Sequence, residues 1–339
     1  MLEFLTSLPT LMHSAIVFGT VIMLGALGEI LTEKSGNLNL GVPGIMYIGA
    51  IAGLIATYFY EVQGGGTNVY VCIVLAIAAS FAASMLAGLI YSFLTITLRT
   101  NQNVTGLTLT IFGSGVGNFF GSSLTKIAGG QPGQIKVPIS YRGFSAYIEP
   151  LVKKLNALAP HVRLGELLFS YGFLTYVAIL IAVAMWFYFQ KTRSGLSLRA
   201  VGENTATADA AGINVTKYKY LATCIGAGIS GLGGLYYVMS YIGGTWESLG
   251  TIEALGWLAV ALVIFTTWKP IRAIWGAYLF GILYWSYNYI PGLDRSSMEL
   301  FKMLPYVVTL AILMIVSFRR KPEDQPPASL GIPYFREER

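Results

Sequence analysis

The sequence carries very little charge. Its 339 residues include 22 Lys and Arg and 16 Asp and Glu, so 11% are charged, whereas ordinary soluble domains carry about 25%. Hydrophobic residues make up 55%, and the mean hydropathy is +0.63. These values exclude a disordered chain and a routine soluble enzyme, because only a lipid environment tolerates so much apolar surface. We therefore expect an integral membrane protein.

Cysteine and histidine are also scarce. Cys72 and Cys224 lie in apolar runs, which excludes a disulfide scaffold and indicates packing residues. His13 and His161 are the only histidines, so we expect no metal site. The chain has no G-x-x-x-x-G-K-[ST], H-E-x-x-H, G-x-S-x-G or C-x-x-C motif, and we therefore expect neither ATP binding by a P-loop, nor catalytic residues, nor a cofactor.

Nine apolar runs are candidates for transmembrane helices, which need about 20 residues to cross roughly 30 Å of hydrocarbon. The Gly-rich stretch Gly113–Gly121 leaves both a continuous helix and a broken or re-entrant one open, so the expected number of spans is eight to ten. The predicted fold is an all-α, polytopic transmembrane helix bundle in which residues 1–318 form a single domain. The nine runs are His13–Ile30, Gly41–Tyr60, Val69–Leu94, Val104–Leu124, Leu167–Phe189, Tyr218–Tyr241, Ala254–Trp268, Ala273–Ile290 and Leu304–Phe318.

Basic residues indicate the orientation. The loop 190–217 and the start of the tail 319–339 both hold clusters of Lys and Arg, and four predicted spans separate them. Because such residues are enriched on the cytoplasmic side, we place both segments there. The N-terminus and the loop 125–165 are then external. Met1–Thr10 lacks the positive region of a signal peptide, so we expect the first span to be retained.

Two further features follow from composition and spacing. The apolar residues of Phe144–Leu158 have nearly helical spacing, which predicts a short helix at the outer surface within the loop 125–165. Pro322–Arg339 is rich in proline and charge, which is typical of a flexible tail. The pI of about 9.1 reflects basic residues flanking the spans, and we expect no nucleic-acid partner.

Three glycines match the motif of a dinucleotide-binding site. Gly226, Gly228 and Gly231 match G-x-G-x-x-G, but a dinucleotide site needs a strand before this motif and a helix that opens at it. Here the motif lies inside an apolar run. We therefore predict that these glycines pack one helix against another.

Polar residues next to a Gly/Pro break form the first candidate for a solute path. In Gly28–Ala50, Asn37 and Asn39 precede Gly41 and Pro43. Broken backbone at membrane depth is tolerated only where it packs inside protein or lines a cavity. Both roles stay open for the two asparagines, namely structural hydrogen bonding and lining of a path.

A second polar series enters the span that follows Arg99. Its side chains either bridge helices or face an aqueous route, and three of them are spaced by four residues along one helix face. Amides and hydroxyls suit an uncharged polar solute. The candidate path residues are Asn37, Asn39, Asn103, Thr110, Ser114 and Asn118.

The loop segment Thr192–Thr216 is polar and rich in alanine. Asn204 or Thr205 is suited to cap a short helix over Ala206–Ala211 that ends at Gly212. A solvated loop is one interpretation. The other is a helix that docks a cytoplasmic partner.

Three runs of the sequence resemble motifs of a known family. The run R-S-G-L-x-L-R-A-V-G-E-N-x-x-x-A-D-A-A-G-I resembles the cytoplasmic coupling-helix motif of ABC importer permeases, in the branch that includes ribose, branched-chain amino-acid and nucleoside systems. The run G-E-I-x-x-E-x-S-G-x-L-N-L-G-x-x-G-I-M resembles the same branch. T-N-Q-N-V-T-G-L-T-L-T-I-F-G looks most like nucleoside permeases that work with a basic-membrane-protein type lipoprotein. The resemblance covers roughly residues 15–318.

The resemblance implies a permease subunit in the bacterial plasma membrane that carries a small uncharged polar solute, and the likeness to nucleoside permeases favours a nucleoside. It implies a core of two permeases, expected to be different chains, with ABC ATP-binding subunits and an external substrate-binding lipoprotein that the surface helix would face. Family members are often drawn with ten helices and an internal N-terminus, from which our nine spans depart. The ATPase-coupling residues that it implies are Gly202, Glu203, Asn204, Asp209, Ala211 and Gly212.

Other functions stay open at this point. A sugar permease of the ribose type and a branched-chain amino-acid permease share much of the pattern. A stand-alone secondary transporter usually has carboxylates inside its spans, whereas Glu29, Glu166 and Glu253 lie near predicted span ends. A membrane enzyme would need a cluster of acid, base or metal-binding residues, and the sequence suggests none.

Overall fold

The computed structural model describes residues 2–129, 135–147, 149–158, 164–247, 250–290, 294–319, 321 and 324–335. Within these residues it contains helices, turns and loops but no strand, which confirms the all-α prediction. Short π-helical turns extend α2, α3 and α11, and a 3-10 turn extends α13. The α-helices are α1 (Leu2–Glu33), α2 (Val42–Tyr58), α3 (Val69–Ser92), α4 (Gln102–Ile127), α5 (Pro138–Ser145), α6 (Glu149–Leu158), α7 (Leu164–Phe169), α8 (Phe173–Lys191), α9 (Arg193–Glu203), α10 (Thr205–Ala210), α11 (Val215–Tyr236), α12 (Thr251–Phe265), α13 (Pro270–Trp285), α14 (Arg295–Lys302) and α15 (Leu304–Arg319).

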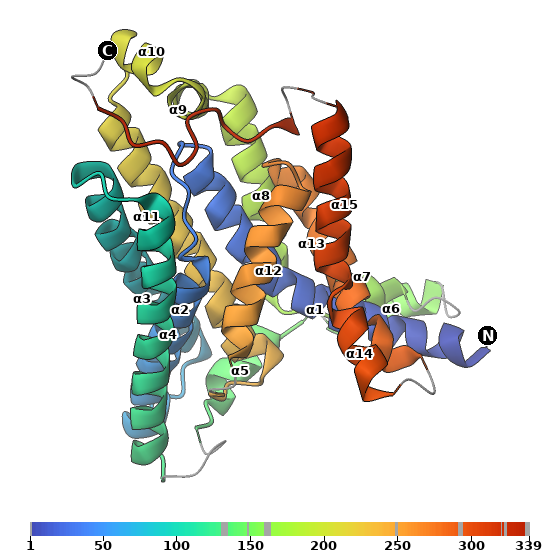
Figure 1. Cartoon of the computed structure of the whole chain (residues 1–339). Coiled ribbons are helices and arrows are strands. Elements are labelled where there is room, and N and C mark those ends of the chain that lie inside the picture. The colour runs from blue at the N-terminus through green and yellow to red at the C-terminus, as the bar shows by residue number, and fades with distance from the viewer. Residues whose placement is uncertain are drawn as a thin grey trace.

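The long helices run between two ends of the bundle (Figure 1). α9, α10 and the C-terminal residues 324–335 lie at one end, which we call the coupling end. α5, α6, α7 and α14 lie toward the opposite end. The first turns of α1 also lie away from the coupling end (Figure 1). Which end faces the cytoplasm stays a prediction.

Five helices of the described chain are long and apolar enough to cross a membrane by themselves. The bent pair of α14 and α15, with an angle of 41° between them, adds a sixth if it counts as one span. α4 has 26 residues but is more polar, and α12 and α13 have only 15 and 16 residues. The predicted count of nine is therefore not confirmed. The five are Pro9–Glu33, Val42–Gln63, Val69–Thr97, Phe173–Lys191 and Val215–Tyr241.

α1 and α11 form the centre of the bundle. In each, 89% of the most apolar stretch is buried, against 28% for α3. The two helices cross where Gly28 meets Gly226, and a Cβ on Gly226 would lie only 2.4 Å from the carbonyl oxygen of Gly28. Only glycine permits this approach, which is the typical way in which membrane helices pack. The predicted packing role of the glycine motif is confirmed.

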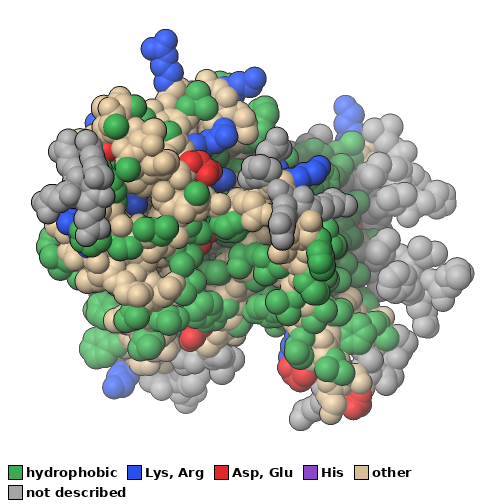
Figure 2. Space-filling model, turned by 45° about the horizontal axis from the view of Figure 1, so that its top comes forward, with side chains coloured by type: hydrophobic (Ala, Val, Ile, Leu, Met, Phe, Trp, Pro, Cys, Tyr) green, Lys and Arg blue, Asp and Glu red, His purple; other side chains and the backbone are tan. Residues whose placement is uncertain are grey.

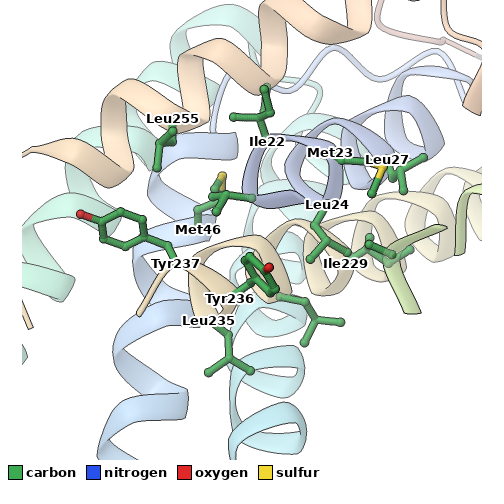
Figure 3. Packing of buried hydrophobic residues seen from close by; sticks show 14 of the residues in the cluster. Ile22, Met23, Leu24, Leu27, Met46, Ile229, Leu235, Tyr236, Tyr237 and Leu255 are labelled. Atoms are coloured by element: carbon green, nitrogen blue, oxygen red, sulfur yellow. The ribbon is translucent and has the colours of Figure 1, made fainter. Parts of the chain in front are cut away.

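Large apolar side chains fill the space around this crossing. Figure 3 shows Ile22 and Leu24 of α1 beside Met46 of α2, Ile229 of α11 and Leu255 of α12. Ile22, Leu24 and Met46 have no exposed surface. Because four helices contribute to one cluster, movement of α1 or α11 must disturb the packing of the others.

α4 continues unbroken through the glycine-rich stretch Gly113–Gly121 to Ile127, so this stretch is neither broken nor re-entrant.

The segment 125–165 differs from its prediction. A single helix over Phe144–Leu158 was wrong, because α5 ends at Ser145 and α6 starts only at Glu149. Pro150 explains the new start, since proline fits the first turn of a helix but breaks its interior. α6 is the surface helix of this segment.

The tail is the second correction. Instead of being flexible throughout, residues 324–335 lie across the coupling end as a strap (Figure 1). The Ser329 N–H donates to the Gly202 carbonyl at 2.9 Å, and the Gly331 N–H donates to the Gly36 carbonyl at 3.3 Å. These bonds join the strap to α9 and to the loop after α1. Composition alone missed them because their acceptors lie far away in the sequence.

Candidate functional site

The polar segment 190–217 folds into two short helices, α9 and α10, rather than one. α9 begins where the Thr192 side chain accepts a hydrogen bond from the Gly195 N–H at 3.0 Å. Its apolar residues Leu198 and Val201 are buried against the bundle. The prediction missed α9, although the spacing of these two residues is helical. α9 fixes the position of the helix that follows.

α10 confirms the predicted short helix. Asn204 is its N-cap, and its Oδ1 accepts from the Thr207 N–H at 2.9 Å. The helix ends at Ala210, and Gly212 then takes a φ of +82°, which favours glycine. The predicted cap and stop residues are thus placed correctly, and the helix starts one residue earlier than predicted.

The outer face of α10 is built from small side chains. Thr205 and Ala208 point inward and are buried. Because the outward side chains are short, a groove on another protein can approach the backbone of α10 closely. The exposed residues on and beside the helix are Glu203, Asn204, Ala206, Thr207, Ala210, Ala211 and Gly212.

Three of the six predicted coupling residues contact the body of the protein or the strap. Gly202 is buried, and a Cβ there would lie 2.3 Å from the Lys34 carbonyl oxygen. Asp209 accepts a hydrogen bond from the Tyr334 hydroxyl of the strap at 2.8 Å. Glu203 is exposed, but its Oε2 accepts the Ala328 N–H of the strap at 3.5 Å. These residues therefore help to hold α9, α10 and the strap together, while Asn204, Ala211 and Gly212 remain on the exposed side.

Asp324 anchors the start of the strap. Its Oδ1 lies 2.7 Å from Lys269 Nζ and 2.9 Å from Arg272 Nη1. These two cations stabilise the carboxylate and lower the pKa of Asp324 to about 2, with Lys269 as the larger cause. Figure 2 shows further Lys and Arg side chains on the coupling end. Sequence reasoning identified neither Asp324 nor Tyr334, because no local motif marks them.

Asn37 and Asn39 lie buried in the loop between α1 and α2. Asn37 Nδ2 donates to Thr223 Oγ1 of α11 at 3.2 Å. Asn39 donates its backbone N–H and its Nδ2 to the two carboxylate oxygens of Glu29, at 3.1 and 3.3 Å. These contacts support the structural alternative for both residues, and a path-lining role for them remains a prediction.

α4 packs its buried face on the same loop. Thr110 Oγ1 donates to the Leu40 carbonyl at 2.8 Å, and the Gln102 side chain accepts from the Leu38 N–H at 2.7 Å. Gln102 was not among the predicted site residues, although it belongs to the same polar series. α4 and the loop therefore form one hydrogen-bonded unit.

The remaining path candidates lie on the outer side of α4. Asn103 is exposed, whereas Ser114 and Asn118 are half-buried. Ser114 Oγ donates to the Ile111 carbonyl at 3.0 Å, and Asn118 Oδ1 is buried with no hydrogen-bond partner in the described part of the chain. The six path candidates thus do not gather around a single cavity, and their role is untested.

Comparison with known proteins identifies the family of the chain. Residues 11–313 match the protein family described as "Branched-chain amino acid transport system / permease component". The chain belongs to this family. It is a permease, so it is a multi-pass membrane protein and a component of a transport system rather than an enzyme.

Three relatives of this permease are informative. The guanosine ABC transporter permease protein NupQ of Bacillus subtilis is 31% identical over 98% of both chains. The nucleoside ABC transporter permease protein NupC of Lactococcus lactis is 28% identical over 91% of this chain and 92% of its own. A proposed glucose ABC transporter permease protein, TsgC13 of Haloferax volcanii, is 35% identical over 80% of this chain and 75% of its own.

One solved structure was also found. It is an inward-facing conformation of an ABC transporter proposed to be of the metal-chelate type. It is 13% identical, covers 90% of this permease and 85% of its own chain, and has a TM-score of 0.45.

Proposed function

We propose that this permease carries a nucleoside inward as part of an ATP-driven importer. The observation that carries the proposal is the near full-length similarity to NupQ, named as a guanosine permease, which covers 98% of both chains. NupC, named as a nucleoside permease, extends the similarity to a second organism. We place the protein in the bacterial plasma membrane.

The importer needs an energy source from another chain. A permease of this family works with an ABC ATP-binding subunit, and the sequence has no P-loop of its own. We propose that two permeases form the core and that an external lipoprotein delivers the solute. In this arrangement α6 and its neighbours at the end opposite α10 face the lipoprotein.

α10 is the proposed coupling helix. Its exposed small side chains fit a groove of the ATP-binding subunit, and α9 ties it to the bundle through Leu198 and Val201. Force on α10 is thereby transmitted to α11, which follows it directly and lies in the core. ATP can shift the transporter between two states only if the closed ATP-binding subunits bind those states with different free energies.

The solute path is proposed to lie along the outer side of α4. Asn103 is exposed there and Ser114 and Asn118 are half-buried, and large apolar residues such as Ile111 and Phe119 are exposed beside them. A second permease packed on this face would enclose these polar groups. In this arrangement the hydrogen bonds of Asn37, Asn39 and Thr110 fix the positions of α4 and of the loop between α1 and α2 on the side away from the path.

The coupling role can be tested in proteoliposomes that contain the purified importer. We expect the double variant Glu203→Lys with Asn204→Ala to hydrolyse ATP while its guanosine uptake falls to the level without ATP. Glu299→Lys on α14 makes the same charge change at the opposite end, on a side chain that is 70% exposed, and should transport normally. Full uptake by the double variant would reject docking through α10.

A pull-down of the tagged chain from native membranes tests the partners. Mass spectrometry should identify a P-loop ATPase, a second polytopic chain and a lipoprotein. Recovery of the chain alone, even after cross-linking, would contradict the proposal of a multi-subunit importer. It would favour a stand-alone transporter instead.

A sugar is the second candidate solute. It is favoured by the 35% identity to TsgC13, which is named as a proposed glucose permease. Competition decides between the two: unlabelled adenosine should suppress uptake of labelled guanosine, and a hundredfold excess of glucose or ribose should not. Suppression by the sugar alone would favour the second candidate.

A further inference from the structure

A polar cavity of about 700 Å³ opens at the coupling end. Its walls come from four parts of the chain: the loop between α1 and α2, the junction between α3 and α4, the segment from the end of α10 to the first turns of α11, and the strap. Tyr334 of the strap and Asp209 of α10 both line it. The contact that ties the strap to α10 is therefore part of the cavity wall.

The charge of the cavity is predominantly positive. Arg99, Lys217 and Lys219 all line it. Among the described residues of the lining, Asp209 is the only acidic one, and its carboxylate accepts the Tyr334 hydroxyl. The first turn of α11, a helix of 22 residues, also lines the cavity and contributes the positive end of its dipole.

Lys219 distinguishes this cavity from an ordinary basic surface. Its side chain is only 3% exposed, and within the described residues no carboxylate or other acceptor pairs with its ammonium group. An ammonium that is buried without a partner is strongly unfavourable, so such groups are normally paired. Arg99 and Lys217, by contrast, are exposed at the mouth. Within the described residues, the arrangement therefore places three cations and a single carboxylate, that of Asp209, around one cavity.

We propose that this cavity binds a phosphate-bearing anion, either a soluble phosphate compound or the headgroup of an anionic phospholipid. Lys219 holds the phosphate from inside, and Arg99 and Lys217 hold it from the mouth. Guanidinium and ammonium groups form charge-assisted hydrogen bonds to phosphate oxygens, which are about twice as strong as neutral ones. Because α10 and the strap share the cavity wall, the bound anion stabilises the docked strap. The proposal does not depend on which solute is transported.

The test uses the purified full-length chain in nanodiscs of phosphatidylcholine. Inorganic phosphate is titrated at constant ionic strength, and binding is measured by isothermal calorimetry and by the rise in Tm. The variant Lys219→Met keeps a long side chain but removes the charge. We expect its phosphate affinity to be roughly tenfold to a hundredfold weaker, as for loss of one hydrogen bond to a charged group.

Lys126→Met is the matched control, because Lys126 is exposed in the last turn of α4, outside the cavity. It should bind phosphate as the wild type does. If Lys219→Met does not fold, the double variant Arg99→Gln with Lys217→Gln replaces it and should lose binding similarly. Size-exclusion profiles identify misfolded variants.

A second arm identifies the source of the phosphate. Nanodiscs that contain phosphatidylglycerol should raise the Tm of the wild type but not of Lys219→Met if the ligand is a lipid. A response to free phosphate alone identifies a soluble ligand. Either response, lost with Lys219, supports the site. No response to either probe, or equal responses in wild type and Lys219→Met, would overturn the proposal.

Discussion

The docked strap leads to a quantitative prediction for Asp324→Asn. In the folded protein the Asp324 carboxylate contacts both Lys269 and Arg272. Lowering its pKa from 3.8 to about 2 corresponds to roughly 2 kcal/mol. Lys269 is 34% exposed and Arg272 50% exposed, so solvent screening reduces this contribution to about 1 kcal/mol. Loss of about 1 kcal/mol shifts the equilibrium between docked and free strap about fivefold.

Hydrogen exchange measures this equilibrium directly. The Ser329 and Gly331 amides donate to carbonyls of the body, so they exchange only when the strap leaves it. We expect Asp324→Asn to accelerate exchange of peptides within residues 327–333 about fivefold, and 0.5 M salt to have a similar effect on the wild type.

Glu299→Gln provides the control. It removes another exposed ion pair, with Lys302 at 2.7 Å on α14, and should leave strap exchange unchanged. The reasoning is refuted if Asp324→Asn exchanges at the wild-type rate, or if the wild-type amides already exchange as fast as in an unfolded peptide.

Three further predictions follow from the described contacts. Asn39→Ala removes the side-chain Nδ2 donor to the buried Glu29 carboxylate and keeps only the backbone N–H donor. It should lower the stability in detergent by about 1–3 kcal/mol, whereas Asn103→Ala, at an exposed site, should not change the Tm. Equal melting temperatures for the two variants would contradict the structural role of Asn39. Gly28→Val places side-chain atoms against α11 and should lower both the Tm and the yield of folded protein, as overpacking of a core does; a Tm equal to that of the wild type would argue against the close crossing. The pKa of Asp324 is lowered on docking, so its stabilisation is fully present above about pH 4 and is lost as the pH falls toward 2; strap exchange, corrected for intrinsic rates, should therefore be constant from pH 5 to 8, and a strong change in that range would refute this assignment.

The helical fold was predictable because apolar length is a local property. Runs such as Val69–Leu94 can satisfy their backbone in lipid only as helices, and the structure has α3 there. α12 and α13 were also located, but their 15 and 16 residues show why a count of spans cannot be settled by apolar runs alone. Tertiary packing covers short helices that would not cross a membrane by themselves.

The candidate site was predictable only in part. Asn204 and Gly212 lie at the ends of α10 as expected, because caps and stops depend on neighbours within a few residues. Gly202 was expected at the coupling surface but is buried against Lys34. Its environment depends on the loop after α1, about 170 residues earlier in the chain by the printed numbering.

The amino-acid sequence by itself determined that the chain is an all-helical membrane protein, where its apolar helices lie, and that α10 is a short capped helix. These properties depend on composition, on apolar runs and on hydrogen bonds between near neighbours. Only the tertiary structure decided that the buried Lys219 lines a polar cavity, that Asn39 binds Glu29, and that Asp324 and Tyr334 fasten the tail across α10. Each of these findings depends on burial or on a partner that folding brings close. Burial and such distant partners are not encoded in a local sequence pattern.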